Sequence, residues 1–222
     1  LLWLVVLAGV PAGAGSQLQG NAVLDKAFYR RSEFWLVGLC VALAFNVSIV
    51  LSICYPPHFM QAGYSAGEAG MILAFAGLCG LTGKAAIAWL GDAGKHHARS
   101  LVVVLLLVQV AGLAVLLQAS ALPLTLCGVG MLGFGGGAFI PMHPYLNSRY
   151  FDAAIISQVN GAQMPLFLPF GLLGAPLAGF SFDRSGSYDT TLVVLAAALC
   201  AAALLTLRLP PGEAQRDRQS AP

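Results

Sequence analysis

The chain has 222 residues, of which 58% are hydrophobic and 9% are charged, whereas about a quarter of the residues of a soluble globular protein are charged. Together with a mean hydropathy of +0.80, this composition excludes a soluble domain, a disordered chain, a disulfide-rich scaffold and a nucleic-acid-binding protein. The five cysteines lie in apolar stretches without Cys-x-x-Cys spacing. We therefore expect these cysteines to pack as small hydrophobic residues and not to bind a metal. The expected solvent is the lipid bilayer.

Taken in order, the chain predicts the end of one transmembrane helix and then six complete ones. Residues 1–15 are the end of an apolar segment, and residues 16–33 form a polar loop. Each apolar run that follows has 16 residues or more and lacks the alternation of a barrel strand, so each is predicted to be a helix. The runs lie at about 34–59, 69–90, 101–118, 122–146, 153–180 and 192–207. The predicted fold is therefore an all-α membrane protein with a six-helix bundle over 34–208 and a disordered tail over 209–222.

The basic residues predict the orientation, because Lys and Arg near the ends of spans stay on the cytoplasmic side. When the connections are assigned alternately to the two sides, one side carries only Arg184. The other side carries nine basic residues, namely Lys26, Arg30, Arg31, Lys95, Arg99, Arg149, Arg208, Arg216 and Arg218. The C-terminus is therefore predicted to be cytoplasmic, in a plasma membrane or the inner membrane of a bacterium.

One lysine belongs to neither side. Lys84 lies eight residues before Asp92, about 12 Å from the cytoplasmic helix end at 1.5 Å per residue. A cation at membrane depth is by default a functional hypothesis, and next to a water-filled pathway Lys84 would attract a carboxylate or a phosphate. The alternative is a lysine that extends to the headgroups.

Four further polar residues are candidates for binding a substrate. Asn160 and Gln163 are three residues apart, so they share one helix face and could point into a cavity; the other two candidates are Asn46 and His143. His143 could also titrate near neutral pH. The alternative for the amides is a hydrogen bond between helices, and for His143 a structural role.

Small residues and prolines indicate how the helices pack. Glycines recur at helical spacing, which lets helix backbones approach closely in lipid. They are Gly77, Gly80 and Gly83, then Gly133 and Gly137, then Gly171, Gly174 and Gly179. Prolines cluster in three of the runs, and each removes a backbone hydrogen bond. We therefore expect bent helices, either lining a cavity or shaped by packing.

No pattern in the sequence predicts catalysis or a bound cofactor. The G-x-G-x-x-G at 128–133 lies within an apolar run and lacks the strand and helix of a dinucleotide site. There is no G-x-S-x-G sequence and no histidine or cysteine set at metal-ligand spacing. No enzyme activity, cofactor or metal is expected.

Several stretches resemble the C-terminal half of a major facilitator superfamily transporter. FMQAGYSAGEA at 59–69 resembles the link between the seventh and eighth helices. GKAAIAWLGDAGK at 83–95 resembles the eighth helix and the loop motif after it, with Ala88 and Ala93 in place of the usual glycine and arginine. GFGGGAFIPMHPYLNSRYF at 133–151 and GFSFDRSGSY at 179–188 resemble the tenth helix and the eleventh-to-twelfth link of the monocarboxylate and oxalate/formate porter branch.

The resemblance implies a secondary transporter that works by alternating access, with an N-terminal half completing the site. It implies that Lys84, like the basic residue after a glycine in the eighth helix of that branch, contacts a substrate carboxylate. Residues Asp92, Gly94 and Lys95 would belong to the gating loop. Dicarboxylate members of that branch carry a basic residue in the eleventh helix, and the run 153–180 has no Lys or Arg, so the resemblance disfavours a dianion such as oxalate. The sequence is compatible with proton coupling, with the proton site on His143 or in the other half.

Three other interpretations remain open at this stage. The chain could be a porter of the same superfamily that carries a neutral or other metabolite. The number of spans also suits a seven-helix receptor, although a retinal protein would need a lysine in the run 192–207, which has none. The third interpretation is a membrane anchor that transports nothing.

Overall fold

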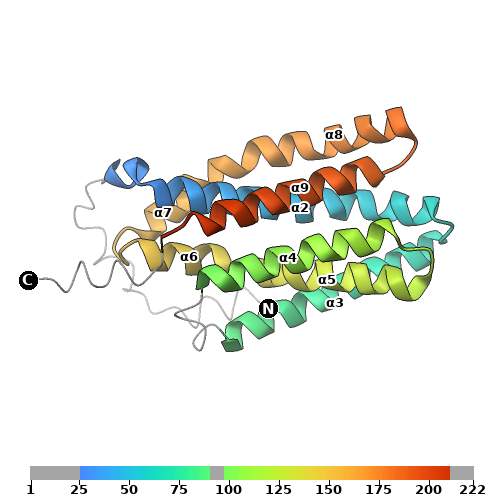
Figure 1. The fold of residues 1–222 in the computed structure, drawn as a ribbon, viewed down its shortest axis with the longest axis horizontal. Helices are drawn as coiled ribbons and strands as arrows, with labels where there is room; N and C mark the ends of the chain where they lie inside the picture. Colours follow the sequence, from blue (N-terminus) through green and yellow to red (C-terminus); the bar gives the residue numbers. More distant parts are fainter. Residues whose placement is uncertain (1–25, 91–97, 211–222) are drawn as a thin grey trace, which may run out of the picture.

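A computed structural model describes residues 26–90 and 98–210 of the chain. The predicted helix end at 1–15, the gating residues Asp92, Gly94 and Lys95 and most of the tail lie outside the described residues. The described part folds into helices that run roughly along one common direction (Figure 1). Their bounds are η1 Lys26–Arg30, α2 Ser32–Gln61, α3 Ala66–Leu90, α4 Ala98–Leu117, α5 Leu122–Phe139, α6 Met142–Tyr150, α7 Ile156–Gln163, η2 Met164–Phe167, α8 Leu168–Ser185 and α9 Asp189–Leu207.

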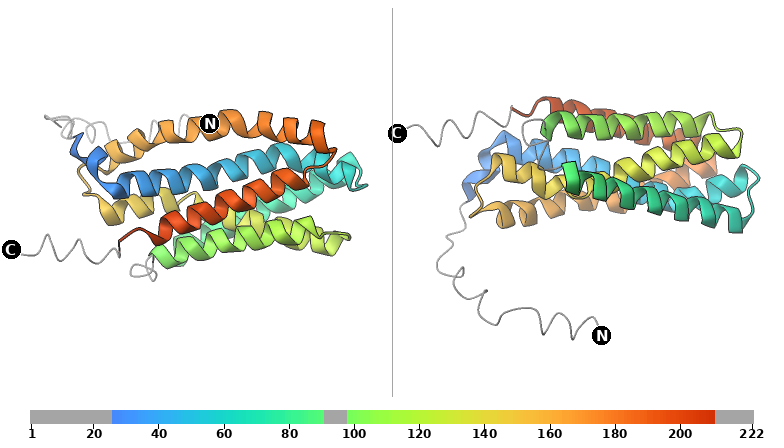
Figure 2. Two further views of the ribbon diagram at one scale, coloured as in Figure 1. Left: turned by 45° about the horizontal axis from the view of Figure 1, so that its top comes forward. Right: turned by 90° about the horizontal axis from the view of Figure 1, so that it is seen from below.

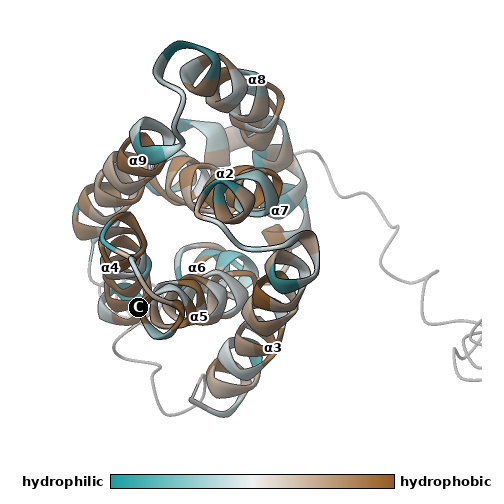
Figure 3. Ribbon diagram, turned by 90° about the vertical axis from the view of Figure 1, so that its right-hand side faces the viewer, coloured by the Kyte–Doolittle hydropathy of each residue, from teal (hydrophilic) through white to brown (hydrophobic). Residues whose placement is uncertain are grey.

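Six segments of the described chain are long and apolar enough to cross a membrane, as the sequence predicted. Five of them are the single helices α2, α3, α4, α5 and α9, and the sixth is the continuous segment Ile156–Ser185 formed by α7, η2 and α8. Seen end-on in Figure 3, α2 lies next to α7, with α8 and α9 on one side of it and α3 on the other. In the most apolar part of α2, 56% of the residues are buried, against 6% in Ile156–Ser185. The molecule is an all-α membrane bundle in which α2 is the central helix.

The turn between α2 and α3 shows why the helices end where they do. Gly63 has a φ of +94°, a backbone conformation that glycine adopts without steric cost. The next amide, that of Tyr64, donates to the carbonyl of Phe59 at 3.1 Å and so closes α2. Ser65 then caps α3, because its backbone amide donates to the Glu68 carboxylate at 2.7 Å while the Glu68 amide bonds to the Ser65 hydroxyl at 3.3 Å.

Two of the predicted runs are interrupted helices and not single ones. The run 122–146 divides into α5 and α6 at Ile140 and Pro141. The run 153–180 divides into α7 and α8 around the short 3-10 turn η2, where Pro165 and Pro169 cannot donate to the preceding turn. α8 continues to Ser185, five residues beyond the predicted end, and stops at Gly186 with a φ of +69°. The expectation that the prolines bend helices is confirmed at these two places.

The pair α3 and α5 shows the expected packing through glycine. A side chain at Gly83 or Gly137 would collide with the backbone of the facing helix, at Phe134 and Gly80 respectively. The two backbones can be in contact only because these residues have no Cβ, and van der Waals contact of this kind drives helix association in lipid. Not every glycine at helical spacing marks a helix contact, because a Cβ added at Gly77 or Gly179 would meet no atom within 4 Å.

Candidate functional site

A buried polar cluster lies near the end of the bundle where α2 begins. Its four side chains come from two short helices, α6 and α7, which follow the helix break after α5 (Figure 2). Three of the four are buried and one is half-buried. We call this group the amide cluster; its members are His143, Asn147, Asn160 and Gln163.

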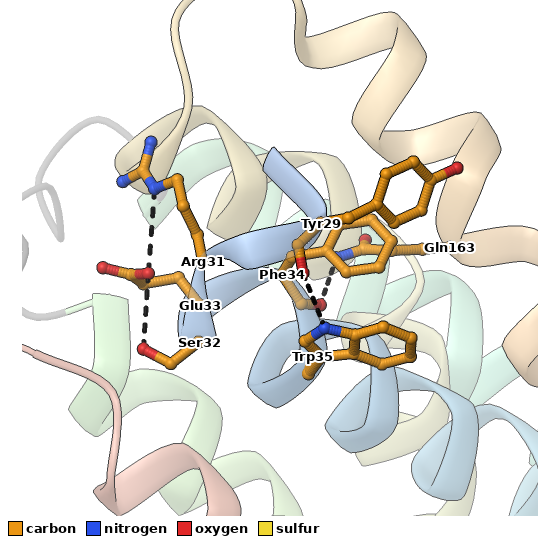
Figure 4. Close-up of polar contacts among 7 residues, drawn as sticks. All are labelled: Tyr29, Arg31, Ser32, Glu33, Phe34, Trp35 and Gln163. Carbon is orange, nitrogen blue, oxygen red and sulfur yellow. Dashed lines mark hydrogen bonds and ion pairs between the residues drawn. The ribbon is translucent and has the colours of Figure 1, made fainter. Parts of the chain in front are cut away.

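Gln163 is the centre of the amide cluster. Its side-chain Nε2 donates to the backbone carbonyl of Phe34 in α2 at 2.8 Å, a contact drawn in Figure 4. Its Oε1 lies 2.7 Å from Nε2 of His143 and 2.7 Å from Nδ2 of Asn147. Because the Phe34 carbonyl can only accept, the orientation of the Gln163 amide is fixed, with Nε2 toward α2 and Oε1 toward α6.

The same logic assigns the hydrogens of the two α6 side chains. Since Gln163 Oε1 can only accept, His143 must carry a hydrogen on Nε2. Asn147 must present Nδ2, which also donates to Oδ1 of Asn160 at 2.6 Å. His143 lies in α6, outside the six spans, and burial lowers the pKa of its imidazole, an effect that the hydrogen bond to Gln163 opposes.

Asn46, the remaining predicted amide, lies on α2 away from the amide cluster. Its Nδ2 donates to the carbonyl of Ala42 at 2.7 Å and to the carbonyl of Phe167 in η2 at 3.2 Å. Its Oδ1 is buried and has no partner. The structure therefore brings three predicted residues together, His143, Asn160 and Gln163, and places Asn46 at the neighbouring helix break.

Lys84 lies on α3, on the edge of the face that packs against α5. Its neighbour Gly83 contacts α5, whereas Lys84 itself is exposed. Among the described residues of the six spans it is the only charged side chain more than one turn from a span end. Thr82 is also exposed, and its hydroxyl donates to the Cys79 carbonyl at 2.7 Å. Residues two apart on a helix do not share a face, and Leu81, three residues before Lys84, is also exposed.

The prediction omitted Asn147 as a site residue, although the signal was present. Asn147 follows His143 by four residues, so in a helix the two side chains lie on one face. In α6 both contact Gln163. Asn160 and Gln163 share one helix face, as predicted, because both contact Asn147; their role in binding a substrate stays a prediction.

Most of the described basic residues lie at one end of the bundle. The start of α2, the start of α4 and the ends of α6 and α9 lie at one end of the bundle (Figure 1). Arg99 donates to the carbonyl of Leu209 at 2.9 Å, and Tyr150 donates to the carbonyl of Pro210 at 3.0 Å. Burial raises the pKa of Tyr150, although Arg99 lowers it and Glu33 raises it further, so the hydroxyl remains a donor. Arg184 lies at the opposite end, over the ring of Phe180.

Six apolar segments, two helix breaks and a buried polar cluster define an integral membrane protein of the polytopic helical class. No protein-family model matches the chain. The chain is 25% identical over 199 residues to mouse monocarboxylate transporter 11, covering 85% of this chain and 44% of that protein. It is 31% identical over 155 residues to bovine monocarboxylate transporter 13, covering 69% of this chain and 36% of that protein.

Human monocarboxylate transporter 11 is 25% identical over 218 residues, which is 95% of this chain and 45% of that protein. The chain is therefore a relative of the monocarboxylate transporters of the major facilitator superfamily, as its helix-end motifs indicated. It spans less than half the length of the curated relatives that it matches.

Proposed function

We propose that the chain forms the C-terminal half of a secondary transporter that carries a small organic anion, such as a monocarboxylate, by alternating access. The six spans and the share of the relatives' length that the chain matches support this proposal. In this architecture two halves rock about a site near the membrane midplane. The proposed protein is a transporter and not an enzyme, and its partners are the bilayer, the substrate and an N-terminal half.

The proposal that the substrate is an anion depends on the position of Lys84. An exposed ammonium group on a span, more than one turn from its end, is costly unless it faces water, a counter-ion or a headgroup. In a substrate pathway its charge would be neutralised by the carboxylate, and a fixed cation would select anions over neutral metabolites. Lys84 is thus the proposed binding residue for the carboxylate.

The role of the polar side chains as substrate ligands stays part of the proposal, with different weight for each. Asn160 is half-buried and is therefore the best placed of the four for direct contact with a substrate. Asn46, His143 and Gln163 are buried and already form hydrogen bonds within the protein. Proton coupling, with a proton site on His143 or in the other half, belongs to the same proposal, as does gating by Asp92, Gly94 and Lys95.

Uptake of radiolabelled monocarboxylates by the complete protein tests the role of Lys84. We expect Lys84→Ala to abolish uptake and Lys84→Arg to retain part of it, because arginine keeps the charge but not the compact ammonium group. Arg184→Ala is the matched control, since it removes a basic residue at a span end, and its uptake should stay within twofold. Unchanged uptake in Lys84→Ala would show a lysine that extends to the headgroups and would remove the case for an anion.

A further inference from the structure

Three consecutive glycines of α5, Gly135, Gly136 and Gly137, each face a different helix. α5 lies between α3 and α4 (Figure 3). A Cβ at Gly137 would collide with the backbone of α3, and a Cβ at Gly135 would collide with the side chain of Gln109 in α4. Gly136 faces α2, where a Cβ would lie 3.0 Å from the hydroxyl oxygen of Ser48. Three helices therefore meet around one turn of α5.

Two oxygen atoms line the space beside Gly136. Apart from the neighbouring turns of α5, only two atoms of the described residues lie within 4 Å of the place that a Cβ would take. They are Oγ of Ser48 at 3.0 Å and Oε1 of Gln109 at 3.9 Å. We call this space, bounded by Gly136, Ser48 and Gln109, the Gly136 notch. Its lining is polar although it lies between apolar spans.

Gln109 points an amide oxygen without a donor into the Gly136 notch. The residue lies near the middle of α4 and is 1% exposed. Its Nε2 donates to the carbonyl of Leu105 at 3.4 Å, which orients the amide with Oε1 toward the notch. Oε1 accepts no hydrogen bond from any residue that the structure describes. A buried oxygen without a donor is costly, so a ligand that donates a hydrogen bond there would be bound favourably.

Ser48 connects the Gly136 notch with the exposed face of α2. It lies near the middle of α2, is half-buried, and shares a helix face with the exposed residues Phe45 and Ser52. Hydroxyl groups in helices often bond to the preceding turn, as Ser52 does to the Ser48 carbonyl at 2.8 Å. Within the described chain the Ser48 hydroxyl makes no hydrogen bond, so it is available both to donate and to accept.

The Gly136 notch and Lys84 lie at the same level of the bundle. A Cβ at Gly83, the neighbour of Lys84, would meet the backbone of Phe134 and Ala138. These two residues lie two positions before and two positions after Gly136. Lys84 therefore lies on the α3 side of this turn of α5, and the notch lies on its α2 side. A substrate whose carboxylate is held by Lys84 can reach the notch with a second polar group.

We propose that the Gly136 notch binds a hydroxyl group of the substrate, so that hydroxy monocarboxylates are preferred over oxo and unsubstituted ones. This inference rests on the proposed transport function. The substrate hydroxyl donates to Oε1 of Gln109 and accepts from Ser48. An oxo group would bring a second acceptor against Oε1, and an unsubstituted chain would leave both side chains unpaired. Gln109 and Ser48 thereby determine specificity, while Lys84 holds the carboxylate.

A series of acids with one carbon skeleton tests this preference. The probes are radiolabelled butyrate, its 2-, 3- and 4-hydroxy derivatives and its 2- and 3-oxo derivatives, taken up by the complete protein. We expect at least one hydroxy acid to have a kcat/KM tenfold or more above that of butyrate and of every oxo acid. Equal kcat/KM values across the series would overturn the inference.

Variants of the Gly136 notch test whether its residues cause the preference. In Ser48→Ala and in Gln109→Met, which keeps a long unbranched side chain, KM for the preferred hydroxy acid should rise tenfold or more. KM for butyrate should stay within twofold, which also shows that each variant folds. Gly136→Ala, whose methyl group fills the notch, should lose the preference in the same way. Ser52→Ala is the matched control, since its hydroxyl lies one turn away on the same face, and it should keep the preference.

The same measurements separate this inference from the transport proposal. An unchanged preference in Ser48→Ala and Gln109→Met would show that the notch holds at most a water molecule, and an equal loss of butyrate and hydroxy acid uptake would show a structural role. Either result overturns the inference, while Lys84-dependent uptake would still support an anion transporter. If the parent protein carries none of these acids, both proposals fail together.

Discussion

His143 and Gln163 are joined by a hydrogen bond of 2.7 Å whose direction is determined by a third group, the carbonyl of Phe34. The imidazole donates through Nε2 in its neutral form and would donate through the same hydrogen if it were charged. Protonation of His143 therefore leaves its bond to Gln163 intact. Protonation instead buries a positive charge, and the free energy of burying that charge determines how His143 contributes to the pH dependence of stability.

We expect His143 to destabilise the fold as the pH falls. Burial lowers the pKa of His143 in the folded protein, while in the unfolded chain it is about 6.5. Above that value both states are neutral and His143 has no pH-dependent effect. Below it the unfolded state binds the proton more readily, so the free energy of unfolding decreases. The comparison of thermal unfolding at pH 7.5 and 5.5 with that of His143→Gln isolates this contribution, and an equal pH dependence in both proteins would contradict it.

Gln163→Leu should destabilise the protein strongly. It removes three hydrogen bonds and leaves the Phe34 carbonyl and the donors of His143 and Asn147 buried without their partner. At an average of about 0.6 kcal/mol for a hydrogen bond in a membrane protein, we expect a loss of about 2 kcal/mol or more. Gln118→Leu is the control, since Gln118 is exposed and its side chain donates to the carbonyl of Ala114 within its own helix. Similar unfolding temperatures for the two variants would be incompatible with a central role for Gln163.

Gly137→Ala should push α3 and α5 apart. The added methyl group would collide with the backbone of Gly80, which cannot move as a side chain can. Overpacking typically costs about 1–3 kcal/mol. Gly77→Ala, on the same pair of helices but with nothing within 4 Å, should be neutral or stabilise by up to about 1 kcal/mol through helix propensity. Unfolding of both variants in detergent measures the difference, and a stability of Gly137→Ala equal to that of the parent would refute the glycine contact.

The orientation in the membrane can be measured with single cysteines in a background without native cysteines. Ser120 lies between α4 and α5, and Ser148 lies near Arg149 at the opposite end; both are exposed. An excess of basic residues marks the cytoplasmic end. An impermeant maleimide added to intact cells should therefore label Ser120→Cys and not Ser148→Cys, and the reverse pattern would invert the proposed topology.

The spans could be predicted because lipid demands long apolar helices, and each of the six complete runs overlaps an observed span. The end of α2 and the start of α3 are set by local chemistry, at Gly63 and at the Ser65 cap, whereas the predicted runs ended at 59 and began at 69. The break at η2 was harder to place. Pro165 and Pro169 indicated a bend, but the position of the 3-10 turn depends on the contacts that hold it, which come from Asn46 more than a hundred residues earlier.

The candidate site could be predicted only within single helices. The spacing of Asn160 and Gln163 places them on one face, and the structure agrees. No spacing rule indicates that Gln163 reaches the backbone of Phe34, because helix rotation and relative height are set by packing of the whole bundle. For the same reason the separation of Asn46 from the other amides appeared only in three dimensions.

The hydrogen bonds to Leu209 and Pro210 set a practical limit on engineering this protein. Arg99 at the start of α4 and Tyr150 at the end of α6 both bond to the chain just after α9, and Leu209 is 1% exposed. A purification tag or a crystallisation truncation placed before Leu209 would remove the two hydrogen bonds that connect α4 and α6 to the chain after α9. The same fusion placed after Pro210 keeps these contacts intact.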